Sequence, residues 1–174
     1  DCGEYISTAY KLQVGHPPGA PLFQMIGRFF SLFAFGDVTK VALMINLMSA
    51  LCSSFTILFL FWTITHLSKK MWMKDGEAAP LSNKVAVLAT GVIGALAYTF
   101  SDTFWFSAVE AEVYAMSSLF TAVVFWAMLK WEEEADMPYA NRWIILIAFL
   151  MGISIGVHLL NLLTIPALVF IYYY

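Results

Sequence analysis

Carboxylates and imidazoles in short polar segments of this otherwise apolar chain are the side chains best suited to acid–base chemistry. Asp1 and Glu4 stand three residues apart, and His16 directly precedes Pro17 and Pro18. A carboxylate in low-dielectric surroundings has a raised pKa and can remove the proton from a hydroxyl. Asp1 or Glu4 could therefore serve as the base in the transfer of a sugar or an acyl group to a hydroxyl.

The spacing of these residues leaves other interpretations open. If the first segment is helical, Asp1 and Glu4 share one face, but spacing alone favours two solvated loop acids over a catalytic pair. His16 could contact a phosphate or a hydroxyl, and it could equally be an ordinary loop residue.

Glu110 and Glu112 precede an apolar run, where a carboxylate gains about 0.3–1 kcal/mol from the N-terminal dipole of a helix. Helix capping is therefore the alternative to a role in chemistry. Residues two apart on a helix point to different sides. We expect only Glu112 to face a site, and we assign Glu110 to capping.

His158 and Asn161 are three residues apart near the end of another apolar run, so a helix would bring them to one face. A packed, hydrogen-bonded pair and a ligand site explain this spacing equally well. The three histidines, His16, His66 and His158, lack the spacing of metal ligands, and we predict no metal site. The sequence also has no glycine-rich phosphate loop and no Cys-x-x-Cys pair.

The composition places these residues in an integral membrane protein. Hydrophobic residues make up 61% of the chain, charged residues only 12%, and the mean hydropathy is +0.77. The net charge of −3 and the absence of a basic cluster interleaved with aromatic residues argue against a nucleic-acid partner.

The predicted fold class is all-α, a polytopic bundle of transmembrane helices in a single domain, because continuous apolar runs are typical of spanning helices and not of barrel strands. We expect about four to five membrane segments. Four helices are predicted over 41–66, 85–101, 113–130 and 143–160, and a further helix begins over 162–174. Asn161 and Pro166 interrupt the last apolar run.

The basic residues indicate the orientation of the bundle. Two loops, 66–84 and 130–142, hold six of the nine basic residues and should be cytoplasmic. Segments 1–40, 102–112 and the turn near His158 then lie on the opposite side, periplasmic or lumenal. The six basic residues are Lys69, Lys70, Lys74, Lys84, Lys130 and Arg142.

Within the first external segment, 1–40, the aromatic stretch 22–35 carries Arg28 as its only charge and suits a short helix in the membrane interface. Residues 102–106 look like a polar turn within an aromatic belt. Because the chain begins at Asp1 without the apolar or basic regions of a signal peptide, we expect an earlier helix to precede it.

Four strings together carry a family resemblance: DCGEY at 1–5, GHPPGAPLF at 15–23, FWFSAVEAEVY at 104–114 and GVHLLNL at 156–162. The chain resembles, over essentially its whole length, a bacterial membrane domain family of formerly unknown function. That family is common in Bacteroidota and is related to eukaryotic transmembrane protein O-mannosyltransferases. The Asp-x-Gly-Glu loop combined with His-Pro-Pro-Gly is the most specific part of the match.

The resemblance implies a GT-C glycosyltransferase that moves a sugar from a polyprenyl-phosphate donor to a protein or glycan hydroxyl. It implies a bacterial inner-membrane protein with its site facing the periplasm, and membrane lipids, donor and acceptor as its partners. No cofactor is expected. An acid in the first external loop is the usual base of that superfamily, which points to Asp1 with Glu4 beside it. The expected substrate-binding residues are His16, Arg28, Glu112, His158 and Asn161.

Two other function classes stay open: a membrane transporter, and a membrane assembly subunit without chemistry. A transporter should place ionisable residues near the middle of the bilayer. Here they concentrate near one edge. The depth at which the candidate residues meet therefore distinguishes the classes.

Overall fold

The computed structural model describes residues 1–72 and 80–173, and every regular element within them is a helix. The predicted all-α class is confirmed. Lys74 of the first basic loop and Tyr174 of the last predicted helix lie outside the described residues.

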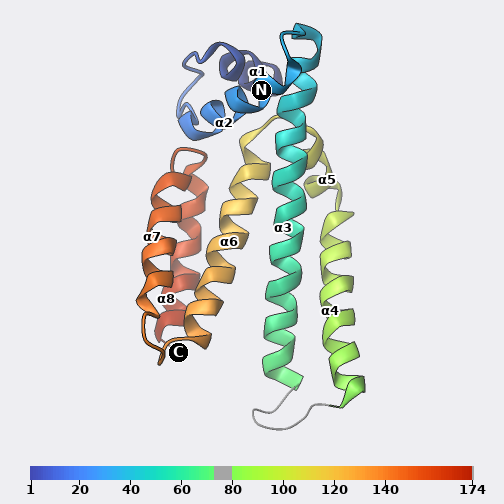
Figure 1. The fold of residues 1–174 in the computed structure, drawn as a ribbon, viewed down its shortest axis with the longest axis vertical. Helices are drawn as coiled ribbons and strands as arrows, with labels where there is room; N and C mark the ends of the chain where they lie inside the picture. Colours follow the sequence, from blue (N-terminus) through green and yellow to red (C-terminus); the bar gives the residue numbers. More distant parts are fainter. Residues whose placement is uncertain (73–79, 174) are drawn as a thin grey trace.

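Three long helices run side by side and form the body of the bundle (Figure 1). They are α3 (Val41–Trp72), α4 (Leu81–Thr99) and α6 (Val113–Glu133), and each is long and apolar enough to cross a membrane. The chain is thus an integral membrane protein. Helix α3 packs against both others and extends six residues beyond its predicted end at 66, where Lys69 and Lys70 complement the negative end of the helix dipole.

A glycine allows α4 to approach α3 closely. A β-carbon at Gly91 would clash with Thr65 and would lie 2.9 Å from Cε2 of Phe61. Small residues at such contacts are the usual way in which membrane helices pack.

The C-terminal part is more broken than its apolar sequence predicts. Helix α7 (Asn141–Ser154) ends six residues before the expected 160, and the 3-10 helix η3 (Leu159–Thr164) and α8 (Ile165–Tyr173) follow. The side chain of His158 accepts a hydrogen bond from the backbone N–H of Leu160, which starts η3. Helix α7 is about 21 Å long at 1.5 Å per residue, short of the roughly 30 Å of a hydrocarbon core.

Two short helices, α1 (Cys2–Lys11) and α2 (Pro21–Ser31), lie across one end of the long helices (Figure 1). Helix α2 and the turn η1 (Leu32–Ala34) form the expected helix over 22–35, and Phe23 and Gly27 of α2 are buried. A second turn, η2 (Val38–Lys40), leads into α3.

The segment expected to be a polar turn over 102–106 is instead the helix α5 (Asp102–Val109). Its first turn closes with a hydrogen bond from the N–H of Trp105 to the carbonyl of Ser101, and Asp102 places a negative charge at the N-terminal dipole. Helix α5 connects α4 to α6 at the end covered by α1 and α2 (Figure 1).

Candidate functional site

Glu4 fastens the loop between α1 and α2 to the first turn of α1. Its Oε1 accepts a hydrogen bond from the backbone N–H of His16 at 2.8 Å, and its Oε2 lies 2.9 Å from Nδ1 of the same residue. A carboxylate only accepts, so Nδ1 carries the hydrogen. Gly19, with φ of +91°, turns the chain back and donates to the His16 carbonyl. The loop therefore holds the imidazole over the start of α1.

The N-terminus of α1 meets the segment that precedes α6. The backbone nitrogen of Asp1 lies 3.3 Å from Oε1 of Glu112, and Oδ2 of Asp1 lies 3.8 Å from Nε2 of His16. We call Asp1, Glu4, His16 and Glu112 the acidic cluster. The prediction that Asp1 and Glu112 lie together is confirmed, and the cluster sits at the end of the bundle where the N-terminus is marked (Figure 1).

The two acids of α1 differ in their surroundings. The hydrogen bonds from the His16 backbone and ring hold the pKa of Glu4 below its ordinary value. The side chain of Asp1 is 67% exposed, and within the described residues its carboxylate has no partner nearer than the His16 ring. Glu4 is thus an anchored carboxylate, whereas Asp1 is open to a ligand.

A cavity of about 720 Å³ adjoins the acidic cluster, between the end of α4, α5 and the start of α6. Asp102, Glu110 and Glu112 bring three carboxylates to its lining. Tyr98 and Ser118 line both this cavity and a second one of about 540 Å³ that extends between α3, α4 and α6. The cavity beside the acidic cluster therefore adjoins a second cavity between the long helices.

The expectation that only one of Glu110 and Glu112 faces a site is wrong, because both line this cavity. Glu110 follows α5 and Glu112 precedes α6, and both have extended backbone angles. The N–H of Glu112 donates to the carbonyl of Glu110 at 2.9 Å, so the chain makes a tight turn at Ala111 and is not the helix on which the expectation rested. Glu110 also does not cap α6, since the N-cap position belongs to Glu112, whose side chain makes no capping hydrogen bond.

His158 reaches the neighbourhood of the cavity through Tyr114, whose ring centroid lies 5.7 Å from that of the imidazole. The adjacent turn also supports α2, because the N–H of Leu22 donates to the carbonyl of Gly156 at 2.8 Å. All four strings that carry the family resemblance thus meet at one end of the bundle.

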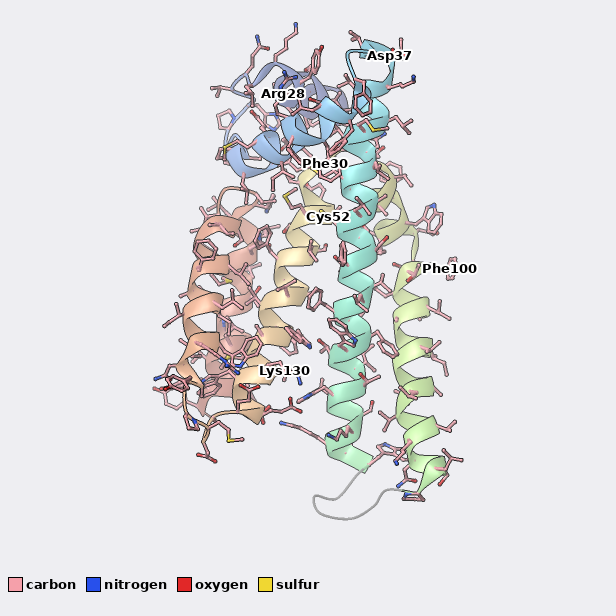
Figure 2. The ribbon with its side chains drawn as sticks, viewed as in Figure 1. Arg28, Phe30, Asp37, Cys52, Phe100 and Lys130 are labelled. Carbon is pink, nitrogen blue, oxygen red and sulfur yellow. The ribbon has the colours of Figure 1, made fainter. Side chains whose placement is uncertain are left out.

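Arg28 joins α2 to α1. Its Nη1 donates to the carbonyl of Tyr10 at 2.9 Å, and its guanidinium lies over the Tyr10 ring at 5.2 Å. Figure 2 shows Arg28 at the same end as the acidic cluster, but no contact between the two occurs within the described residues. These contacts indicate a packing role.

Asn161 is buried, with 2% of its surface exposed, and both polar atoms of its side chain form hydrogen bonds. Its Oδ1 accepts from the hydroxyl of Ser117 at 2.6 Å, and its Nδ2 donates to the carbonyl of Ser154 at 3.2 Å. Its side chain is not paired with that of His158. The amide connects α6, α7 and η3 beside the deeper cavity, so it supports the walls of the site.

Tyr5 also lies beside the acidic cluster, although its residue type alone does not indicate this in the sequence. Its ring centroid lies 6.0 Å from that of His16 and 5.3 Å from that of Phe23. Burial, and then the nearby charge of Glu112, raise the pKa of the Tyr5 phenol. Tyr5 follows Asp1 by four residues, and this helical spacing is the sequence feature that predicts the two side chains on one face of α1.

Comparisons with known proteins agree with the resemblance in the four strings. The family model for the Protein O-mannosyl-transferase TMEM260 N-terminal domain matches residues 1–174. The Protein O-mannosyl-transferase TMEM260 of Mus musculus is 30% identical over 156 residues, which are 89% of this chain and 19% of the mouse protein. Protein O-mannosyl-transferase tmem260 of Dictyostelium discoideum is 29% identical over 124 residues, 71% of this chain and 13% of that protein.

No solved structure matches the chain. The chain spans less than a fifth of the length of these two relatives. The family match nevertheless covers every residue, including all members of the acidic cluster. The chain belongs to the TMEM260 N-terminal domain family, and the predicted relationship to transmembrane O-mannosyltransferases is confirmed.

Proposed function

We propose that this chain forms the catalytic end of a membrane glycosyltransferase that moves mannose from a polyprenyl-phosphate carrier to a hydroxyl of a protein or glycan. The choice of mannose follows the names of the two relatives. The observation that carries the proposal is the acidic cluster. In it, residues as far apart in the sequence as Asp1 and Glu112 meet beside a cavity that adjoins a second one between the long helices.

Asp1 is the proposed base. A base needs a free lone pair and a pKa that lets it hold a proton during the reaction. The carboxylate of Asp1 is exposed, whereas both oxygens of Glu4 are occupied by His16 and its pKa is lowered. Glu4 is therefore the positioning residue, which keeps the His16 ring beside Asp1.

In the proposed reaction, the acceptor oxygen attacks the anomeric carbon of the sugar while the Asp1 carboxylate takes the hydroxyl proton. The bond between the anomeric carbon and the phosphate oxygen breaks, and the lipid phosphate leaves with the electron pair. A single displacement of this kind inverts the configuration at the anomeric carbon. His16, whose Nε2 lies 3.8 Å from Oδ2 of Asp1, is the hydrogen-bonding group at this end that would stabilise the leaving phosphate.

The lipid tail of the donor would lie among the apolar helices, with its phosphate at the end that carries the acidic cluster. The positive-inside rule assigns that end to the non-cytoplasmic side, because the basic residues Lys69, Lys84 and Lys130 lie toward the other end. A periplasmic or lumenal site follows from this assignment.

A transporter is the weaker candidate. The apolar runs 41–65, 85–101 and 113–129, which make up most of the three long helices, contain no Asp, Glu, Lys or Arg. A coupled transporter usually carries ionisable residues near the middle of the bilayer. The ionisable residues discussed here gather instead near the ends of the helices.

The experiment is a transfer assay with the full-length protein, a serine- and threonine-containing acceptor peptide and labelled mannose. Polyprenyl-phosphate mannose should yield a mannosylated peptide, and a nucleotide-linked mannose should yield none. Transfer from the nucleotide sugar alone would contradict the proposed donor, and absence of transfer from both would contradict the proposed function.

A further inference from the structure

A third cavity, lined in part by lysines, lies between α3, α4 and α6 at the end of the bundle opposite the acidic cluster. It has a volume of about 600 Å³, and its lining includes Lys69, Lys84, Lys130 and His66. Figure 2 shows Lys130 toward this end and Arg28 at the other. The proposed transfer reaction uses none of these residues.

The cavity has a surplus of positive charge. Three lysines and one carboxylate, that of Glu133, line it, which leaves a formal charge of +2 when His66 is neutral. Glu133 is already paired with Lys130, while Lys69 and Lys84 make no ion pair within the described residues. The ammonium groups of Lys69 and Lys84 come from α3 and α4 and would attract a phosphate between them.

His66 supplies a second and independent indication of a ligand. Its side chain is only 9% exposed, its Nδ1 lies 3.1 Å from Oε1 of Glu133, and its buried Nε2 has no hydrogen-bond partner. Because the carboxylate only accepts, Nδ1 carries the hydrogen and Nε2 of the neutral ring is an acceptor. A buried acceptor without a partner is costly, and a hydroxyl of a bound molecule would satisfy it.

The remaining wall of the cavity is apolar except for Thr65, whose hydroxyl bonds to a backbone carbonyl within α3. Trp62 lies on α3 and Trp126 on α6, and Val87 and the exposed Leu88 lie on α4. Tryptophan commonly lies at the level of lipid headgroups. An amphiphile whose phosphate meets the lysines and whose hydrocarbon chains follow the apolar face of α4 matches this arrangement better than a free phosphate ester.

We propose that this cavity binds the headgroup of an anionic phospholipid that carries a hydroxyl next to its phosphate. Lys69 and Lys84 bind the phosphate, and Nε2 of His66 accepts the hydrogen bond from the hydroxyl. The site lies in the leaflet opposite the acidic cluster.

The test measures lipid binding to the full-length protein in detergent by native mass spectrometry, with a thermal-shift assay in parallel. Phosphatidylglycerol should bind in preference to phosphatidylcholine. It should also bind in preference to phosphatidylmethanol, which has the same charge and no headgroup hydroxyl. The double variant Lys69→Gln/Lys84→Gln should bind phosphatidylglycerol about tenfold more weakly or worse, with an unchanged melting temperature in the absence of lipid.

The matched control is Lys11→Gln/Lys40→Gln, which removes two lysines from the opposite end and should leave binding unchanged. Equal loss in both double variants would overturn the site, as would equal binding of phosphatidylglycerol and phosphatidylcholine. If glycerol phosphate binds as tightly as phosphatidylglycerol, the ligand is a soluble phosphate ester and the lipid assignment is wrong. Equal binding of phosphatidylmethanol would overturn the role of His66.

Discussion

Asp1 and Glu4 carry the same functional group, and their contacts give them different properties. Two hydrogen bonds from one residue, His16, lower the pKa of Glu4, whereas Asp1 stays open beside the ring of that histidine. Hydrogen bonds to the ionised form always act in this direction. The geometry therefore separates an anchored acid from an open one within a single helical turn.

The contact between Glu4 and His16 should make stability depend on acidity. A lowered folded pKa contributes stability that is fully present above the ordinary value of 4.5 and is lost as the pH falls through the folded value. The difference in melting temperature between the wild type and Glu4→Gln should therefore be constant above about pH 4.5 and shrink below it. A difference that grows on acidification would contradict the contact.

The meeting of Asp1, Glu4, His16 and Glu112 could be predicted, because all four stand in polar segments on one side of the predicted spans. The side chain of Glu110 could not be oriented, since that required 110–112 to be known as a tight turn between α5 and α6. The hydrogen bonds from Asn161 to α6 and α7 were also beyond prediction, as they depend on where α7 ends.

At the level of elements, apolar runs locate the helices well and their ends poorly. The run after 143 contains no charged residue to stop a helix, yet α7 ends at Ser154, and His158 starts a new turn, η3, by bonding to the backbone N–H of Leu160. Helix α5 was missed because its eight residues are too few for a clear period. Local side-chain contacts set these boundaries, and hydropathy does not report them.

The close packing of α3 and α4 should depend on Gly91. Gly91→Ala would force a methyl group against Phe61 and Thr65, and overpacking of this kind typically costs about 1–3 kcal/mol. Gly152→Ala is the matched control, because its β-carbon would meet nothing within 4 Å. A thermal-unfolding comparison in detergent should show a lower melting temperature for Gly91→Ala only. Equal melting temperatures would mean that the two helices lie farther apart.

Across the whole molecule, the acidic cluster and the lysine-lined cavity occupy opposite ends of the long helices. This separation predicts the result of cysteine labelling in a background in which Cys2 and Cys52 are replaced. The exposed positions Val14 and Met137 lie in loops at the two ends. A membrane-impermeant reagent added from the non-cytoplasmic side should label Val14→Cys in intact membranes. It should label Met137→Cys, on the cytoplasmic side, only after the membrane is permeabilised. Labelling of both from one side would exclude the orientation.

The central claim is that the carboxylate of Asp1 is the base of a sugar-transfer reaction, and the turnover of Asp1→Asn in the full-length protein tests it most directly. Asparagine keeps the size of the side chain and removes its basicity, so transfer from polyprenyl-phosphate mannose should fall about 100- to 10,000-fold. Donor binding should change little. Asp37→Asn, a second acid at the same end that is bonded to Thr39, should retain normal turnover. Near-normal transfer by Asp1→Asn would contradict the account, and loss of transfer in Glu4→Gln alone would identify Glu4 as the base.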